Sequence, residues 1–122
     1  MARLLGKKAP SSGIGAQKAK KKPLADHSVQ NIVLDEKLDK YFAITQKAIN
    51  MVESCPRDEM RLSEAKDFLN MAKSYFSDAQ HFRKKGDYVL AFAAVNYAHA
   101  WLDAGARIKL FKVHDSTLFA AD

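Results

Sequence analysis

The sequence predicts an all-α protein: a small up-and-down three-helix bundle with a flexible, basic N-terminal extension. Three segments between residues 34 and 111 carry apolar residues at steps of three and four, which is the spacing of one helix face. None of them shows the strict alternation of a half-buried strand. Pro56 and Gly86 separate the segments, so the chain is expected to reverse direction at both places.

The first two predicted helices flank the loop around Pro56. The first spans about residues 34–54, and the second spans about residues 60–85, up to Gly86. The second helix carries an unbroken run of three- and four-residue apolar steps, as in the seam of an antiparallel bundle. The two apolar stripes consist of Leu34, Leu38, Tyr41, Phe42, Thr45, Ala48, Ile49 and Val52, and of Leu62, Ala65, Leu69, Ala72, Phe76 and Ala79.

The third predicted helix spans about residues 87–111 and begins at a tight corner. Gly86 suits the left-handed residue that caps the second helix, and Asp87 suits the N-cap of the third. The third helix is apolar on two sides, which predicts contacts with both other helices. Beyond it, three apolar residues are candidates to fold back onto the bundle: Val113, Leu118 and Phe119.

The excess positive charge lies entirely in the first 25 residues, which hold seven basic residues and no acidic ones. The rest of the chain holds 13 Lys and Arg against 14 Asp and Glu, so the body is nearly neutral. Prolines, glycines and serines keep the N-terminal segment from forming a helix or a core. We therefore divide the chain into an unstructured arm, residues 1–27, and a helical bundle with a short C-terminal tail, residues 28–122. The basic residues of the arm are Arg3, Lys7, Lys8, Lys18, Lys20, Lys21 and Lys22.

A flexible arm of this charge suits a polyanionic partner, because spaced lysines replace the counterions of nucleic-acid phosphates. We expect a non-enzymatic RNA-binding protein, ribosomal or ribosome-associated, whose basic arm threads into ribosomal RNA. Its partners would be ribosomal or other structured RNA and neighbouring ribosomal proteins. If an aromatic residue also contacts RNA, Tyr97 is the best candidate, because it falls between the two apolar stripes of its helix. The alternatives are a helical protein–protein adaptor with a solubilising tail and a small helical-bundle RNA-processing enzyme.

Several other functional classes find no support in the sequence. No apolar run suits a signal peptide or a membrane span, so we expect a cytoplasmic protein without membrane contact. Cys55 is the single cysteine, and no His/Cys cluster has the spacing of a zinc site. The chain carries no glycine-rich phosphate loop, nucleophile elbow or HExxH motif. We expect no catalytic residue, metal, cofactor or small-molecule substrate.

Two groups of polar residues in the bundle are candidates for chemistry nonetheless. His99 and Asp103 are one helical turn apart, so the carboxylate could orient the imidazole, and Asp78 could face them from the second helix. We favour a structural interpretation, in which such residues hydrogen-bond one another and lock the helix register. Arg107 and His114 have the loose spacing found in ribonucleases built on small helical bundles.

A distinctive set of motifs fills the second half of the chain: Tyr75, Asp78-Ala79, Phe82, Gly86-Asp87, Ala91, Tyr97-Ala98-His99, Trp101-Leu102-Asp103-Ala104-Gly105 and Arg107. With these residues the chain resembles the archaeal family called "domain of unknown function 357", over roughly residues 34–113. The resemblance implies a three-helix bundle and an archaeal source, and it implies no activity. Ala100 and Lys109 stand where the resemblance leads us to expect glycine. Their side chains leave less room for close helix contacts at those positions. The basic arm lies outside the resemblance.

Overall fold

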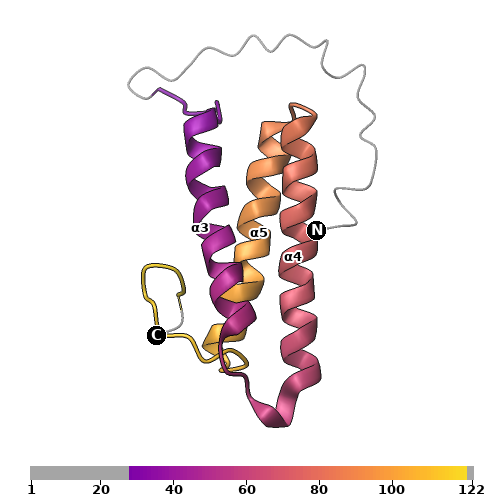
Figure 1. Ribbon diagram of the computed structural model, residues 1–122. Helices are drawn as coiled ribbons and strands as arrows, with labels where there is room; N and C mark the ends of the chain where they lie inside the picture. The colour runs from indigo at the N-terminus through magenta and orange to yellow at the C-terminus, as the bar shows by residue number, and fades with distance from the viewer. Residues whose placement is uncertain (1–27, 121–122) are drawn as a thin grey trace. The chain divides into compact units, whose positions relative to one another are not determined.

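The structure is a computed structural model, and it describes residues 28–120. Residues 28–32 form neither helix nor strand, and the compact helical unit begins at Val33. This unit is an antiparallel three-helix bundle, which confirms the predicted fold class (Figure 1). Its elements are helix α3 (Asp35–Ser54), a single 3₁₀ turn η1 (Glu59–Arg61), helix α4 (Leu62–Lys84) and helix α5 (Tyr88–Arg107).

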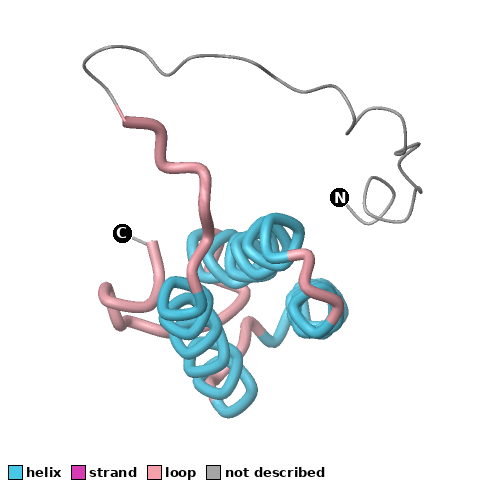
Figure 2. The backbone as a smooth tube through the Cα atoms, turned by 90° about the horizontal axis from the view of Figure 1, so that it is seen from above, coloured by secondary structure: helices cyan, strands magenta, loops and turns pink. Residues whose placement is uncertain are grey.

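Helix α5 packs against both α3 and α4, and Figure 2 shows the three helices nearly end-on. It buries residues on both of its apolar sides, as the two stripes predicted. Many of these residues are alanines, which let the neighbouring helices approach closely. The buried residues of the three helices include Leu38, Ala48, Val52, Ala65, Leu69, Ala72, Ala91, Ala94, Val95, Ala98 and Leu102.

The corner between α4 and α5 has the predicted chemistry. Gly86 takes the left-handed conformation, with φ of 84°, and its N–H donates to the Arg83 carbonyl. The N–H of Asp87 donates to the Phe82 carbonyl, which completes a Schellman cap at the end of α4. The Asp87 carboxylate then accepts the N–H of Leu90 at 3.2 Å and caps α5.

The end of the third helix corrects the sequence prediction. Helix α5 ends at Arg107 rather than near residue 111, because Lys109 takes the left-handed conformation with φ of 64°. The N–H of Leu110 bonds back to the Gly105 carbonyl at 2.8 Å, so α5 ends in the same type of cap as α4. This cap turns the Phe111 ring back onto Gly105, where an added Cβ would lie 2.2 Å from the ring. Phe111 is 1% exposed and belongs to the core.

The segment after α5 pairs with the connection between α3 and α4. Phe111 and Arg57 form an isolated antiparallel bridge, flanked by the bond from the Lys112 N–H to the Pro56 carbonyl at 2.9 Å. The Arg57 guanidinium donates to the Val52 carbonyl at 3.0 Å and caps the end of α3. Arg61 donates to the Ile108 carbonyl at 2.7 Å. These bonds fix the lower end of the bundle as drawn in Figure 1.

The opposite end of the bundle is held by a charged cluster. The Arg83 guanidinium contacts the carboxylates of Asp35 and Asp39 at 3.0 and 2.7 Å, and it therefore joins α4 to the start of α3. The Tyr88 hydroxyl donates to Asp35 at 2.6 Å. The bonds from Tyr88 and Arg83 lower the pKa of the Asp35 carboxyl, and the bond to Asp35 raises the pKa of the Tyr88 hydroxyl.

This cluster predicts a dependence of stability on acid. A carboxyl with a lowered pKa stabilises the fold above its unfolded pKa of about 4, and the contribution is lost as the pH falls through the folded value. Tyr88→Phe removes the hydrogen bond that lowers the pKa of Asp35 most. The difference in melting temperature between pH 7 and pH 2.5 should therefore be smaller in Tyr88→Phe than in the unmodified chain. Tyr41→Phe is the matched control, since the Tyr41 ring packs edge-on against Phe92 and keeps that contact. An unchanged pH dependence in Tyr88→Phe would contradict the role of this bond.

Candidate functional site

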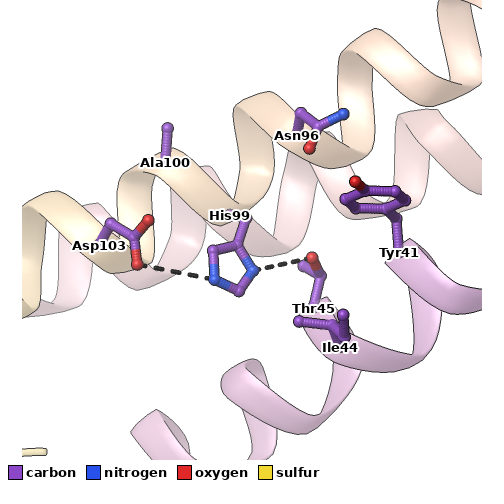
Figure 3. A pocket seen from close by; sticks show the side chains of 7 residues that line it. All are labelled: Tyr41, Ile44, Thr45, Asn96, His99, Ala100 and Asp103. Atoms are coloured by element: carbon purple, nitrogen blue, oxygen red, sulfur yellow. Dashed lines mark hydrogen bonds and ion pairs between the residues drawn. The ribbon is translucent and has the colours of Figure 1, made fainter. Parts of the chain in front are cut away.

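A hollow of about 210 Å³ opens between α3 and α5, around the predicted candidate His99. Figure 3 shows the imidazole of His99 between Asp103 of the same helix and Thr45 of α3. The rest of the wall mixes aromatic, aliphatic and polar side chains. The lining residues are Tyr41, Ile44, Thr45, Asn96, His99, Ala100 and Asp103.

Both ring nitrogens of His99 are engaged. Nε2 lies 2.6 Å from the carbonyl oxygen of Leu118, and Nδ1 lies 2.9 Å from the hydroxyl oxygen of Thr45. A carbonyl oxygen can only accept, so Nε2 carries a hydrogen that it donates to Leu118, and Nδ1 is within hydrogen-bond distance of the Thr45 hydroxyl. Thr45 is 2% exposed, so its hydroxyl depends on this bond. His99 therefore joins three segments of the chain: α3, α5 and the C-terminal segment.

Asp103 supports the same arrangement. One of its carboxylate oxygens lies 3.6 Å from Nε2 of His99 and accepts the N–H of Ala120 at 3.0 Å. Leu118 and Phe119 are only 7% and 4% exposed, so the C-terminal segment does fold back onto the bundle. The sequence could not reveal the Leu118 carbonyl as a partner. Thr45 did leave a signal, because it is a polar residue within an apolar stripe.

The geometry fits a helix-locking role better than proton transfer. A general base needs a nitrogen that can reach a substrate, and both nitrogens of His99 are taken by groups of the protein. Asp78 is not among the residues that line the hollow, so the structure does not bring it together with His99 and Asp103. Within residues 28–120, no group of three or more His, Cys, Asp or Glu is placed to hold a metal ion.

The remaining polar candidates lie apart from this hollow. Arg107 is exposed at the end of α5, and His114 is exposed beyond the bridge that follows it. Across the described part of the chain, no hydrogen bond joins these two side chains. Cys55 is half-buried after α3, and burial raises the pKa of its thiol, which lowers the fraction of reactive thiolate.

A second, apolar hollow of about 260 Å³ lies between α4 and α5 and shares Ala100 with the first. Phe68 meets the Trp101 ring edge-on at 5.0 Å, and Tyr97 meets the Tyr75 ring edge-on at 4.6 Å. Tyr97, the aromatic candidate for RNA contact, is therefore half-buried and packed against another ring. Tyr97 also lines the hollow.

The arm residues predicted to contact RNA lie outside the described residues. They are Arg3, Lys7, Lys8, Lys18, Lys20, Lys21 and Lys22. Among residues 28–120, no helix is both long enough and apolar enough to cross a membrane.

These features define a small antiparallel three-helix bundle that is closed at one end by the segment after α5. The chain belongs to the family described as "Protein of unknown function (DUF357)", whose profile matches residues 40–111. The match includes most of α3, all of α4 and α5, and the bridge residue Phe111. No curated protein and no solved structure matches the chain.

Proposed function

We propose that this protein is a non-enzymatic RNA-binding protein, ribosomal or ribosome-associated, whose basic arm contacts the phosphates of structured RNA. The observation that carries the proposal is the separation of charge: seven basic residues and no acidic ones in the first 25 residues, against a nearly neutral body. Such an arm binds through phosphates and carries little sequence information. Ribosomal or other structured RNA is the partner, and neighbouring ribosomal proteins would contact the bundle.

The bundle offers support of a negative kind for a binding role. His99, which lines the hollow between α3 and α5, has both nitrogens occupied by Thr45 and by the Leu118 carbonyl. A carboxylate beside it, Asp103, is likewise engaged with a backbone N–H. These groups hold the fold together, so we assign partner binding to other parts of the chain.

The arm proposal predicts the salt dependence of RNA binding. If about five of the seven basic side chains engage phosphates, the arm should contribute about −3.5 to −4.5 to the slope of log affinity against log salt. Changing Lys18, Lys20, Lys21 and Lys22 to Gln should flatten this slope and weaken binding to all sequences alike. We would measure fluorescence anisotropy of a labelled structured ribosomal RNA fragment across a salt series, with the full chain.

A charge-matched variant controls for net charge. It changes Lys37, Lys66, Lys84 and Lys85 to Gln, because all four are exposed in the bundle and form no ion pair within the described residues. The control should keep most of the slope. Equal affinities and slopes for the arm variant and the unmodified chain would refute the proposal.

A protein–protein adaptor is the second candidate, and one observation favours it. The exposed Ala100 of α5 lines both hollows, and the hollow between α4 and α5 is lined by Phe68, Tyr97, Trp101 and two alanines. An apolar face with aromatic rings is typical of a protein-binding surface. If the arm lysines have no effect on RNA binding, this function would take first place.

A further inference from the structure

The residue at the left-handed position of the α5 cap is a lysine. Lys109 is the one non-glycine residue with positive φ among residues 28–120, whereas the corresponding position of the α4 cap is Gly86. A left-handed conformation is unfavourable for an L-residue, whereas glycine adopts it freely. Stability alone therefore favours glycine at position 109. Backbone strain held in place by its surroundings is often associated with function.

The surroundings of Lys109 hold its backbone firmly. The next residue, Leu110, is fully buried, and its N–H bonds to the Gly105 carbonyl. Its carbonyl accepts the N–H of Asp58 at 3.1 Å, from the connection between α3 and α4. The Lys109 side chain thus projects into solvent from a backbone that is fixed on both sides.

Lys109 is part of a local excess of positive charge. Residues 104–114 include Arg107, Lys109 and Lys112 and no acidic residue, and all three cations are exposed. Within the described part of the chain, none of the three forms an ion pair. We call Arg107, Lys109 and Lys112 the basic end of the bundle.

The charged groups that face the basic end are mostly occupied. Asp58 pairs with Arg61 at 2.7 Å, and the Arg61 guanidinium also donates to the Ile108 carbonyl. The pKa of the Asp58 carboxyl is lowered first by the Met60 N–H, then by Arg61, with a smaller effect of the Lys112 charge. Glu59 is the other acidic residue of this connection, and it is exposed. The basic end therefore keeps cations that are free to bind an anion.

We propose that the basic end is a second contact surface for RNA phosphates, fixed in position on the bundle and separate from the arm. This inference rests on the proposed function, because it takes RNA as the partner. A structured RNA presents phosphates at fixed places, so it can make use of a lysine held at one strained position. An anionic membrane attracts mainly the total charge near its surface, and a lysine at an unstrained neighbouring position would serve it equally well.

The decisive variant is Lys109→Gly, because the fold and the binding should respond in opposite directions. Removal of the strain should raise the melting temperature. Loss of one phosphate contact should weaken RNA binding and reduce the steepness of the salt dependence by about 0.7–0.9. Lys109→Arg keeps the charge and should retain the affinity. The triple change of Arg107→Gln, Lys109→Gly and Lys112→Gln should reduce the steepness by about 2–3.

The experiment uses the full chain and a labelled structured ribosomal RNA fragment across a salt series. Lys84→Gln with Lys85→Gln is the control, because both lysines are exposed at the opposite end of the bundle. The inference is overturned if Lys109→Gly raises the melting temperature without changing the affinity or the slope. It is also overturned if the control pair weakens binding as much as the changes at the basic end.

The arm variant, measured in the same series, separates this inference from the proposed function. Weaker binding in the arm variant alone would support the arm and refute the basic end. Weaker binding in the triple variant of the basic end alone would support the basic end and refute the arm. Unchanged binding in both variants would refute both proposals. Vesicles containing phosphatidylserine test a lipid partner, since exposed Met60, Leu62 and Ile108 lie on the same end. Vesicle binding that depends on Lys109, without RNA binding, would overturn the assignment to RNA.

Discussion

Replacing Phe111 by alanine is expected to lower the free energy of unfolding by about 3–5 kcal/mol, more than any other single substitution in this bundle. Phe111 is 1% exposed, and its ring occupies the space that a side chain at position 105 would take. It also forms the bridge with Arg57, so it ties the end of α5 to the connection between α3 and α4. Urea unfolding followed by circular dichroism would measure the loss.

The partner change, Gly105→Ala, makes this prediction specific to one contact. Its Cβ would lie 2.2 Å from the Phe111 ring, so the single variant should destabilise the bundle by about 1–3 kcal/mol through overpacking. In the Phe111→Ala background the ring is gone, and alanine is favoured over glycine in a helix by roughly 0.5–1 kcal/mol. The effect of Gly105→Ala should therefore change sign. Additive effects of the two changes would contradict the described packing.

The helices themselves were predictable because their signals are local. The three- and four-residue apolar steps depend only on neighbouring turns, and the Gly86–Asp87 corner combines a residue suited to positive φ with a good N-cap. The predicted end of α5 was wrong for a related reason. A cap is recognised by glycine, and the left-handed residue of this cap is Lys109. The sequence does depart from an expected glycine at this position, and in the structure this position is a helix end rather than a helix contact.

The environment of His99 was predictable only in part. The one-turn spacing from His99 to Asp103 follows from helix geometry, and the two side chains do lie 3.6 Å apart. The bonds to Thr45 and to the Leu118 carbonyl join residues that are 54 and 19 positions away in the sequence. The C-terminal segment has no periodic pattern, so no local signal places its carbonyl beside an imidazole. Tertiary packing decides such contacts, and sequence periodicity cannot report them.

Ending the chain at His114 should lower the free energy of unfolding by about 3–6 kcal/mol. The estimate adds the burial of Leu118 and Phe119, which are 7% and 4% exposed, at about 1.5–3 kcal/mol each. The same truncation removes the carbonyl that accepts the His99 N–H at 2.6 Å. Phe119→Ala alone should account for about 1.5–3 kcal/mol of this loss, since its ring packs beside the imidazole. Thermal and urea unfolding would measure both variants.

Ser116→Ala is the control for the truncation, because Ser116 is exposed and should leave the free energy of unfolding within about 0.5 kcal/mol. An equally stable truncated chain would show that the segment does not pack on the bundle. RNA binding provides a second test of the truncated chain. Residues 115–122 contain no Lys or Arg, so truncated protein that remains folded should bind structured RNA at least as tightly as the full chain. A loss of affinity in folded protein would instead place the His99 hollow or its covering segment in the RNA-binding surface.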